Sequence, residues 1–426
     1  MAMNAAVNLA DAVLGRKPVS SGPSEPIEDP TTRMSAVVWH KALDMRYELV
    51  PRPVICAPTD AIIRVTATSI CGSDLHVYAG EVPGMNEGDI VGHEFMGIVE
   101  AKGVEVELPI GARVVVAFAI ICGKCEFCQR GEFSSCSTTN SSRVQEQAVG
   151  HNSCGIFGFG ALAGDYKGGQ AEYVRVPFAD LNCLPIPIDL LDEKALYLSD
   201  IIPTSYHAAR DVREGDTVAI WGMGPIGLLA ARWCQILGAR RIVGISGTAY
   251  RLDVAHKKLG IEVINYNEQD VNRTLADMEP RGWDVAIDAA GYRFAKGVLH
   301  KVQRTLMLET DTSETITECC KALRPFGKLT IIATYVGLAN QFPMGMFMFK
   351  NLTMRCGGTP IQKLWRYCLE KVLDGTLDPR FVVTHYMRLS EGPEAYKLMY
   401  EHEDNFIKAL LRPDLPPELK PAGAGI

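Results

Sequence analysis

The chain has 426 residues, of which 47% are hydrophobic and 22% charged, and its 43 Lys and Arg against 50 Asp and Glu give a formal net charge of −7. A mildly acidic chain of ordinary composition has no electrostatic reason to bind nucleic acid or an anionic membrane. No apolar run approaches the roughly 20 residues that span a bilayer. Because the length suits two domains better than one core, we expect a two-domain cytoplasmic protein that binds neither nucleic acid nor membrane.

Residues 1–33 carry no convincing export signal, because their short apolar stretch is interrupted at Asp11. The serines and prolines between Pro18 and Pro30 predict a disordered or loosely draped arm. Over residues 34–201, short β-branched runs alternate with Gly and Pro, which is typical of a β-rich, partly irregular domain. The clearest predicted strands of this domain are Ser35–Val38, Ala61–Ala67, Phe95–Glu100 and Arg113–Ala117.

Residues 202–357 have a different texture, in which short apolar runs alternate with longer helical patterns. This alternation predicts βαβ units and a doubly wound parallel sheet, so we expect an α/β domain. Residues 358–426 add a helix at Lys363–Leu373 and a strand at Phe381–Tyr386, and we expect them to return to the first domain. Within 202–357 the predicted strands are Thr217–Trp221, Ile242–Ile245, Val285–Asp288 and Lys328–Ala333, and the predicted helices are Ile226–Leu237, Arg251–Leu259 and Ser313–Leu323.

A glycine motif, Gly-Met-Gly-Pro-Ile-Gly, lies between the first predicted strand and the first predicted helix of this second domain. Glycines at these positions permit a tight turn and let the backbone approach a pyrophosphate, while the helix N-terminus offers free N–H groups to the phosphates. An ordinary glycine-rich turn is the alternative, but the strand before it and the helix after it favour dinucleotide binding. The predicted cofactor contacts are Gly222, Gly224, Pro225, Ile226 and Gly227.

The end of the second strand of such a domain is informative about the cofactor. An acid is expected there for NAD, because a carboxylate binds the ribose 2′-hydroxyl. Here the strand is followed by Ser246, Gly247 and Thr248, with Arg251 nearby and no carboxylate. Small residues and an arginine suit a 2′-phosphate and slightly favour NADP. Alternatively, Arg251 is only a solvated residue at a helix start and the site accepts NAD.

The 13 cysteines are an odd number, which argues against a disulfide framework. One compact loop holds four of them in the pattern Cys-x-x-Cys-x-x-Cys-x₇-Cys. Four thiolates in one loop suit a closed tetrahedral zinc site, which would stabilise the loop and take no part in catalysis. An iron–sulfur cluster is the alternative, although nothing else suggests redox-metal chemistry. The predicted ligands are Cys122, Cys125, Cys128 and Cys136.

A second set of metal-binding residue types is dispersed along the chain. Cys71 opens the run Cys-Gly-Ser-Asp-Leu-His, His93 lies in Gly-His-Glu, and Asp200 ends Tyr-Leu-Ser-Asp. A catalytic zinc has about three protein ligands and one open position, so a sulfur, a nitrogen and an oxygen donor would complete it. A lone His is more often an ordinary core or surface residue. The hypothesis therefore depends on the dinucleotide motif elsewhere in the chain.

Taken together, these motifs resemble the zinc-containing medium-chain alcohol dehydrogenases, and the resemblance extends from about Met34 to Leu411. It is closer to the glutathione-independent formaldehyde dehydrogenase branch, in which an aspartate at the position of Asp200 replaces the cysteine of most relatives. The resemblance implies a GroES-like catalytic domain, a Rossmann domain, and one catalytic and one structural zinc per chain. Besides the cysteine loop, it is carried by Cys71–Tyr78, Val91–Gly97, Gly168–Val174, Ala195–Asp200, Ile220–Gly227 and Leu308–Ser313.

The resemblance also implies a role for each site residue. Ser73 would take the proton of the alcohol, and His76 would pass it to solvent through the cofactor ribose. Asp74 and Glu94 would orient the ligands; a helix cap for Asp74 and a simple salt bridge for Glu94 are the alternatives. The catalytic zinc would be bound by Cys71, His93 and Asp200.

The expected reaction is hydride transfer between a nicotinamide cofactor and an alcohol, aldehyde or ketone. In this branch a long insertion, here residues 137–167, covers the cofactor; a floppy surface loop is the alternative. A retained cofactor would favour aldehyde dismutation, and a biosynthetic reductase of a larger carbonyl compound or a non-catalytic scaffold are further alternatives. The family implies a homodimer or homotetramer paired through the dinucleotide-binding domains, for which the apolar strand Leu329–Val336 would serve as an edge.

Overall fold

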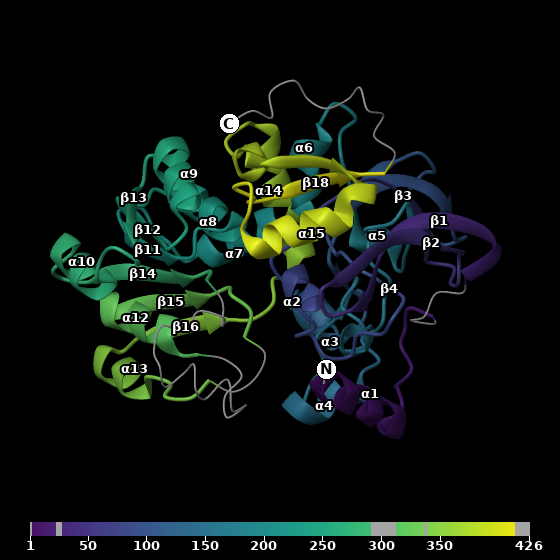
Figure 1. Ribbon diagram of the computed structural model, residues 1–426, viewed down its shortest axis with the longest axis horizontal. Helices are drawn as coiled ribbons and strands as arrows, with labels where there is room; N and C mark the ends of the chain where they lie inside the picture. The colour runs from purple at the N-terminus through teal and green to yellow at the C-terminus, as the bar shows by residue number, and fades with distance from the viewer. Residues whose placement is uncertain (1, 23–27, 291–311, 336–338, 414–426) are drawn as a thin grey trace. The chain divides into compact units, whose positions relative to one another are not determined.

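The computed structural model describes residues 2–22, 28–290, 312–335 and 339–413. The chain forms two compact units (Figure 1). Unit 1 comprises Met1–Pro203 and Thr359–Ile426, and unit 2 comprises Thr204–Gly358. Residues 308–311 of the Leu308–Ser313 motif lie outside the described residues. No helix in the described ranges is long and apolar enough to cross a membrane.

Unit 1 is built mainly from antiparallel strands, as its β-branched runs predict. At its centre, β3 (Ala61–Thr68) pairs with β5 (Phe95–Lys102), β9 (Tyr173–Val176) and β18 (Ala409–Arg412). Because β18 comes from the end of the chain, the last segment completes the sheet of the first domain. The other strands of unit 1 are β1 (Glu28–Lys41), β2 (Asp44–Pro53), β4 (Asp89–Ile90), β6 (Arg113–Val116), β7 (Ala119–Ile120), β8 (Gly155–Ile156), β10 (Cys183–Pro185) and β17 (His385–Arg388).

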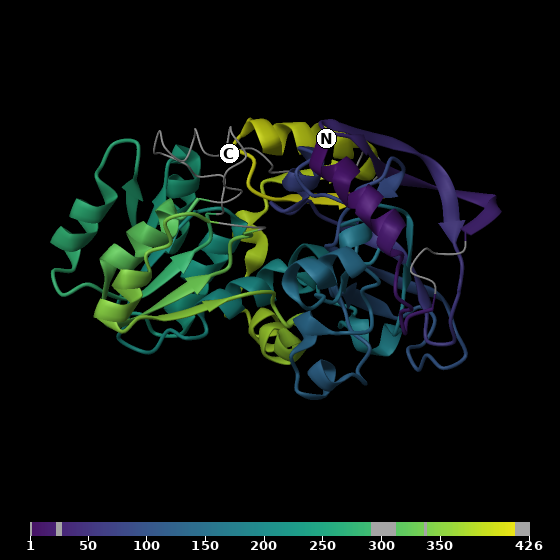
Figure 2. The same cartoon turned by 90° about the horizontal axis from the view of Figure 1, so that it is seen from below.

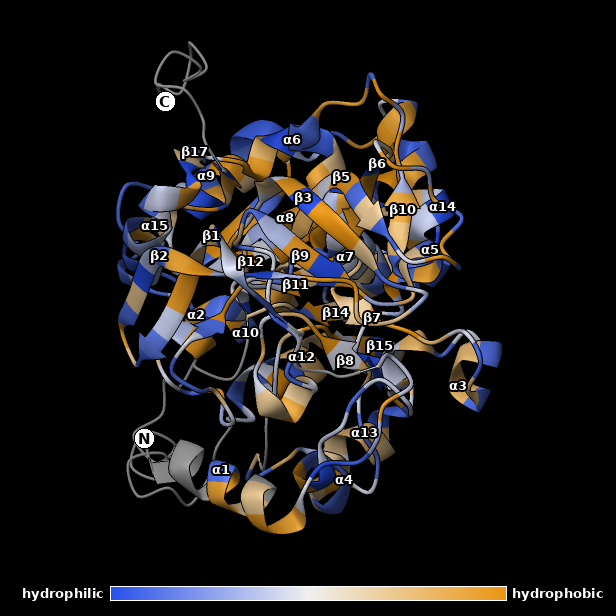
Figure 3. Ribbon diagram, turned by 90° about the vertical axis from the view of Figure 1, so that its right-hand side faces the viewer, coloured by the Kyte–Doolittle hydropathy of each residue, from blue (hydrophilic) through white to orange (hydrophobic). Residues whose placement is uncertain are grey.

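The helices of unit 1 are mostly short and lie between these strands. Along the edge strand β2, hydrophilic and hydrophobic residues alternate in Figure 3, which agrees with its mixed burial. The α-helices are α1 (Ala2–Leu14), α2 (Asp74–Tyr78), α3 (Glu126–Gln129), α4 (Arg143–Val149), α5 (Ala179–Asn182), α6 (Asp192–Ala195), α14 (Ile361–Leu373) and α15 (Gly392–Glu401), and α7 (Ile201–Ala209) begins at the boundary of the units. The 3₁₀-helices are η1 (Phe133–Ser135), η2 (Ala161–Ala163), η3 (Leu196–Ser199), η4 (Pro379–Val382) and η5 (Leu389–Glu391).

Unit 2 is a parallel sheet of six strands in the order β13-β12-β11-β14-β15-β16, with helices on both faces (Figures 1 and 2). This order is that of a Rossmann fold, with β11 and β14 meeting at the point where the strand order reverses. The predicted α/β class is therefore confirmed. Its strands are β11 (Thr217–Trp221), β12 (Arg241–Ser246), β13 (Glu262–Asn265), β14 (Trp283–Asp288), β15 (Leu323–Ile331) and β16 (Thr353–Cys356), and its helices are α8 (Pro225–Ile236), α9 (Ala249–Leu259), α10 (Val271–Met278), α12 (Glu314–Ala322) and α13 (Met344–Lys350).

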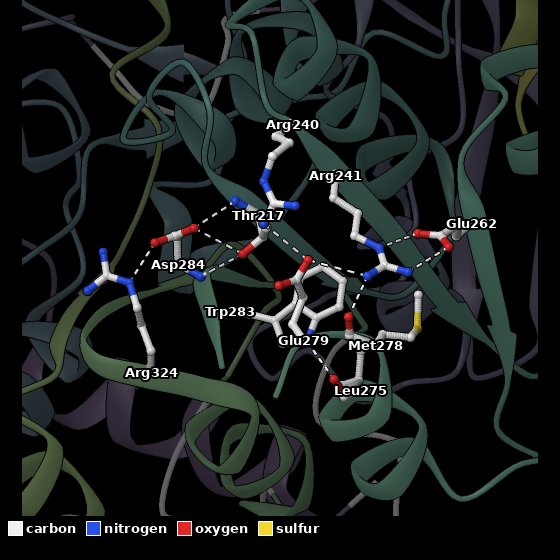
Figure 4. Close-up of polar contacts among 10 residues, drawn as sticks. All are labelled: Thr217, Arg240, Arg241, Glu262, Leu275, Met278, Glu279, Trp283, Asp284 and Arg324. Carbon is white, nitrogen blue, oxygen red and sulfur yellow. Dashed lines mark hydrogen bonds and ion pairs between the residues drawn. The ribbon is translucent and has the colours of Figure 1, made fainter. Parts of the chain in front are cut away.

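The amino ends of these parallel strands are joined by a polar network (Figure 4). Asp284 accepts hydrogen bonds from the backbone N and the hydroxyl of Thr217 at 2.8 and 3.0 Å and from Arg324 Nε at 2.6 Å. Arg241 donates to both carboxylate oxygens of Glu262, at 2.6 and 2.8 Å. Ligands of doubly wound sheets bind at the opposite, carboxyl ends of the strands. We therefore assign this network a structural role.

The prediction of a disordered N-terminal arm is wrong for much of its length. Residues Ala2–Leu14 form α1, which lies beside α4, and the following segment pairs with the chain after the cysteine loop. Lys17 N and Ser20 N donate to the carbonyl oxygens of Ser141 and Thr138, at 3.0 and 2.9 Å. The apolar, Ala-rich start favours a helix, and the polar segment after it is held by these two backbone hydrogen bonds.

Two further predictions need correction. The predicted strand Phe381–Tyr386 is divided between η4 and β17, because Pro379 starts a helical turn that the Asp378 side chain caps through Arg380 N. The predicted edge strand Leu329–Val336 falls on β15, which lies between β14 and β16. The edge on this side of the sheet is β16, a short and mostly exposed strand that hydrophobicity alone does not reveal.

Candidate active site and metal centres

The four cysteines of the loop come together around a common centre. Their sulfur atoms lie within 4.8 Å of one another. Cys122 Sγ is 3.9 Å from Cys128 Sγ, and Cys125 Sγ is 3.9 Å from Cys136 Sγ. Zinc–sulfur bonds of ~2.3 Å in a tetrahedron place the sulfurs about 3.8 Å apart. The loop geometry therefore fits a zinc ion.

Backbone groups of the loop favour a thiolate within this group. Lys124 N and Cys125 N both donate to Cys122 Sγ, at 3.4 and 3.3 Å. A hydrogen bond from Cys136 is the largest of the effects that lower the pKa of Cys122, to about 4, and these backbone bonds add to it. Thiolates are the form that binds zinc. The loop thus has the chemistry as well as the spacing of a closed metal site.

The dispersed residues also meet, in unit 1. Cys71 lies between β3 and α2, His93 and Glu94 lie between β4 and β5, and Asp200 lies between η3 and α7. Ligand atoms of these four residues lie within 4.8 Å of one another. Strand pairing between β3 and β5 brings the first two segments together, since Ser69 N donates to Glu94 O at 3.0 Å.

The distances within this group match those between zinc ligands. Asp200 Oδ2 is 3.7 Å from Cys71 Sγ and 3.3 Å from His93 Nε2. Tetrahedral zinc with bonds of ~2.0–2.3 Å separates its ligand atoms by about 3.3–3.8 Å. Burial raises the pKa of the Cys71 thiol. A cation among these donors is the natural way to hold the thiolate in a buried place.

Asp74 fixes the orientation of His93. Its Oδ1 is 3.0 Å from His93 Nδ1, and its Oδ2 accepts a hydrogen bond from Cys71 N at 2.8 Å. Burial lowers the pKa of His93, but the Asp74 carboxylate and the Asp200 contact more than offset this and raise it well above its ordinary value. With Nδ1 occupied, Nε2 is directed to Asp200. The helix-cap alternative fails, because the cap position of α2 is Ser73 and Asp74 binds backward to Cys71.

Glu94 contacts a buried lysine that sequence reasoning missed. Lys408 Nζ donates to Glu94 Oε1 at 2.6 Å and to Ile70 O at 2.9 Å, and both charged residues have 0% exposure. Burial raises the pKa of Glu94, and Lys408 opposes that shift. The available signal was a single lysine inside the apolar run Phe406–Leu411, a position where a charge needs a partner.

The second oxygen of Glu94 provides a test of whether a cation fits here. Glu94 Oε2 is buried and has no hydrogen-bond partner among the described residues. The group contains one thiol and two carboxyl groups. Lys408 pairs with one of these carboxylates, that of Glu94. An unsatisfied buried carboxylate oxygen is costly. The donor set and this orphan oxygen both fit a metal ion with an adjacent carboxylate.

Ser73 and His76 lie on the exposed side of the same segment. Both side chains are partly exposed, in contrast to the buried Asp74 between them. His76 Nδ1 is 3.0 Å from Glu81 Oε2, and the exposed fraction of the His76 side chain is 18%. His76 N donates to Ser73 O at 3.1 Å, which keeps the two residues on one helical turn. The arrangement leaves both groups available to exchange protons with solvent.

In unit 2 the glycine motif forms the expected turn between β11 and α8. Gly222 has φ +93°, and a Cβ there would meet Ala289 O at 2.6 Å. A Cβ on Gly227 would meet Gly222 O at 1.8 Å, so neither position tolerates a side chain. At Gly224, the N-cap of α8, a Cβ would have only Arg251 Nη1 nearby, at 3.9 Å. Open space at a helix N-terminus is what a pyrophosphate requires, and Pro225 and Ile226 begin the helix there.

The residues after β12 form the turn into α9. The strand ends at Ser246, whose hydroxyl accepts a hydrogen bond from Thr248 N at 3.2 Å. Gly247 packs on Tyr266, where a Cβ would lie 2.4 Å from the ring. Arg251, on the first turns of α9, points back to Gly224. No acid stands at the end of β12.

The insertion 137–167 is ordered and packed in unit 1. It contains α4, β8 and η2, and Ser142 caps α4 by accepting a hydrogen bond from Gln145 N. Tyr166 is 4% exposed and donates its hydroxyl to Thr139 O at 2.7 Å. The alternative of a floppy loop is therefore wrong. That the insertion covers the cofactor stays a prediction.

A Rossmann unit with a glycine-rich turn and a β-rich unit with two metal-ligand groups define a zinc-dependent oxidoreductase that uses a nicotinamide cofactor. Comparison with known proteins specifies the class further. Residues 57–188 match the alcohol dehydrogenase GroES-like domain, and residues 225–302 match the zinc-binding dehydrogenase family.

The relatives extend over nearly the whole chain. A zinc-type alcohol dehydrogenase-like protein of Schizosaccharomyces pombe is 45% identical over 95% of this chain and 97% of its own. The glutathione-independent formaldehyde dehydrogenase of Pseudomonas aeruginosa is 33% identical over 79% of this chain and 85% of its own. The structure of alcohol dehydrogenase TADH from Thermus sp. ATN1 superposes with a TM-score of 0.76, at 31% identity, over 89% of this chain and 100% of that one. The chain belongs to the zinc-containing medium-chain alcohol dehydrogenase family and is a zinc-dependent enzyme of that type.

Proposed function

We propose that Cys71, His93 and Asp200 bind the catalytic zinc and that the enzyme interconverts an alcohol and its aldehyde or ketone at this site. The observation that carries the proposal is the matched spacing of a sulfur, a nitrogen and an oxygen donor around one buried point. Zinc held by these residues would supply Lewis-acid polarisation of the substrate oxygen, and a bound nicotinamide would supply the hydride chemistry. The four loop cysteines bind a second, structural zinc.

The chain's own residues move the proton. Ser73 accepts it from the substrate hydroxyl, and His76 passes it to solvent, because both side chains are partly exposed on one turn beside the buried group. Asp74 holds His93 in one tautomer and orientation, which is the usual function of a carboxylate behind a zinc-binding imidazole. Glu94, anchored by Lys408, presents its second oxygen to the ligand group.

The cofactor proposed is NADP in preference to NAD. Ser246, Gly247 and Thr248 are small or neutral where NAD enzymes carry an acid, and Arg251 supplies a positive charge close to the phosphate-binding turn.

The Asp200 donor supports membership of the formaldehyde dehydrogenase branch within the family. A homodimer paired along the edge strand β16 is also proposed. Exposed apolar residues lie on β16 and on α13 in the same unit: Met344, Met348, Phe349 and Met354.

The test is turnover of an alcohol and aldehyde panel, followed by reduced-nicotinamide absorbance with NAD or NADP, for wild type and Asp200→Ala. Asp404→Ala is the matched control, because Asp404 also contacts a histidine, His385 at 3.1 Å, but is 73% exposed. We expect turnover in wild type and Asp404→Ala and its collapse in Asp200→Ala. Full activity in Asp200→Ala would contradict the ligand assignment. Products without net absorbance change, an alcohol paired with an acid, would indicate dismutation instead.

A further inference from the structure

A buried glutamine, Gln170, connects the two segments that lead to Cys71 and His93. The residue is fully buried and lies just before β9. Its side-chain Nε2 donates to Ser69 O at 3.0 Å, two residues before Cys71. Its backbone N donates to Val91 O at 3.0 Å, two residues before His93. One residue thus forms hydrogen bonds to both of the segments that carry these ligands.

The segment before His93 packs directly on the Gln170 side chain. Gly92 has φ +90°, and a Cβ there would lie 2.5 Å from Gln170 Cγ. Gly169 N also donates to Gly92 O at 2.7 Å. Glycine is required at residue 92 both for its conformation and for space. The glutamine therefore fixes the backbone of the residue that precedes the histidine.

The segment before Cys71 is held through Ser69. Ser69 N donates to Glu94 O at 3.0 Å, and the Ser69 hydroxyl donates to Ala409 O at 2.6 Å. The carbonyl oxygen of the same residue accepts the hydrogen bond from Gln170. Because Ser69 is fully buried, removal of the amide would take a hydrogen bond from a buried carbonyl oxygen. The amide therefore contributes to the placement of Cys71.

Tyr396 on α15 lies close to this glutamine and to the ligand group. Its ring centroid is 5.6 Å from that of Tyr78 on α2, the short helix that follows Cys71, and α15 packs on α2 (Figure 1). Burial raises the pKa of the Tyr396 hydroxyl well above its ordinary value, the charges of Asp74 and Cys71 raise it further, and the Gln170 amide opposes the shift. The hydroxyl therefore stays protonated and can donate a hydrogen bond.

Two polar atoms at this place match each other. The Tyr396 hydroxyl and Gln170 Oε1 are both buried, and neither has a hydrogen-bond partner in the part of the chain that the structure describes. A phenol donates and an amide oxygen accepts, so the two groups are complementary. One hydrogen bond, direct or through a single water, would satisfy both atoms and avoid the cost of leaving them unpaired.

We propose that Gln170 and Tyr396 are positioning residues that hold the Cys71 and His93 segments at the separation a metal ion requires, with the Tyr396 hydroxyl orienting the Gln170 amide. This inference rests on the proposed function of the Cys71, His93 and Asp200 group. Both residues act through backbone groups of residues 69 and 91–92 rather than by binding metal or substrate. Removing a group that orients metal ligands weakens metal binding by about 10- to 100-fold.

The experiment measures zinc binding in Gln170→Met and Tyr396→Phe, which nearly keep the size of each side chain. Competition with a chromophoric chelator gives the affinity, and the cysteine site serves as the internal reference. We expect the affinity of the catalytic group to fall about 10- to 100-fold in Gln170→Met. In Tyr396→Phe we expect a loss of about fivefold, for one hydrogen bond. The double variant should resemble Gln170→Met, because both changes remove the same contact.

The matched control is Gln235→Met. Gln235 also donates its side-chain amide to a backbone carbonyl, that of Leu259 at 2.6 Å, but it lies in unit 2. Cobalt in place of zinc gives a second readout, since its visible absorption depends on the arrangement of its ligands. We expect the bands of cobalt bound by the catalytic group to shift in Gln170→Met and to stay unchanged in the control.

These measurements separate this inference from the proposed function. Wild type that binds a single metal ion, held by the four loop cysteines, would refute the proposed function itself. If wild type binds two ions but turns over no alcohol, the affinities and spectra of the variants still decide the inference. Folded Gln170→Met and Tyr396→Phe proteins with wild-type affinity and a wild-type cobalt spectrum would overturn it, and so would equal weakening of both metal sites.

Discussion

The two metal-ligand groups of this enzyme are built in opposite ways. The cysteine group comes from one loop, Cys122–Cys136, and has four ligands of one kind. The catalytic group is assembled from three segments that are far apart in the chain, and it combines different donors with an acid and a lysine behind them. A closed set of thiolates needs only its own loop to hold a metal. A catalytic metal site needs an open coordination position and neighbouring groups that hold its ligands in one orientation. These groups come from distant segments, so tertiary structure must bring them together.

The largest effect that distinguishes the groups is expected from His93→Ala. It removes the imidazole whose Nε2 lies 3.3 Å from Asp200 Oδ2. The same carboxylate oxygen lies 3.7 Å from Cys71 Sγ. We expect kcat/KM to fall by roughly 10³-fold or more, about 4 kcal/mol, with one zinc lost per chain. Steady-state kinetics and zinc analysis check this. Retained turnover with a single zinc would show that the dispersed group is not the catalytic one.

Cys128→Ser is expected to affect stability more than chemistry. The sulfur lies 3.9 Å from Cys122 Sγ in the closed group, and loss of a structural metal is among the most destabilising of single changes. We expect the free energy of unfolding to fall by more than about 4 kcal/mol, while the folded fraction keeps its kcat. Denaturant unfolding and kinetics at low temperature provide the measurement. A fully stable variant with reduced kcat would reverse the assigned roles.

Lys408→Met tests the charge behind the catalytic group. It leaves Glu94 buried without the lysine that contacts it at 2.6 Å, and breaking a buried pair costs about 3 kcal/mol. The double variant Lys408→Met, Glu94→Gln should lose less free energy of unfolding than the two single variants lose together, because the double change leaves no unpaired charge. Thermal and denaturant unfolding of the four proteins measure the coupling. Strict additivity would mean that the pair contributes nothing.

Asp74→Asn is expected to weaken the catalytic zinc without removing a ligand. An amide keeps the size of the side chain but loses the charge that raises the pKa of His93. Loss of such an orienting carboxylate weakens metal binding by about 10- to 100-fold. Competition with a chromophoric chelator measures the affinity of this site, and the cysteine site serves as the internal reference. Equal weakening of both sites would indicate a general loss of structure.

The smallest expected effect concerns the cofactor. Arg251→Ala removes the guanidinium that lies 3.9 Å from the Cβ position of Gly224. We expect KM for NADP to rise about tenfold, while that for NAD changes little, because one charge-assisted contact to a phosphate contributes about 1.5 kcal/mol. Parallel cofactor titrations check the difference. An equal effect on both cofactors would assign Arg251 to the shared pyrophosphate instead.

Local patterns allowed much of this structure to be predicted. The cysteine loop and the glycine motif depend on spacing within a few residues, and the strand Thr217–Trp221 has the predicted bounds. The catalytic group was predicted from residue types together with the dinucleotide motif and the family resemblance, because no local signal links Cys71 to Asp200. Lys408 and Tyr396 were missed as site neighbours, since their positions depend on β18 returning to β3 and on α15 packing on α2. The helical arm and the edge strand β16 were missed because packing, not periodicity, decides them.

The central claim is that two separate zinc ions occupy the two groups and that only one of them serves the reaction. Anomalous diffraction at the zinc edge from crystals of active wild type and of Asp200→Ala tests it most directly. We expect two peaks in wild type, one among Cys122, Cys125, Cys128 and Cys136 and one among Cys71, His93 and Asp200, and only the first in the inactive variant. A wild-type enzyme with turnover but no peak at the second group would contradict the claim.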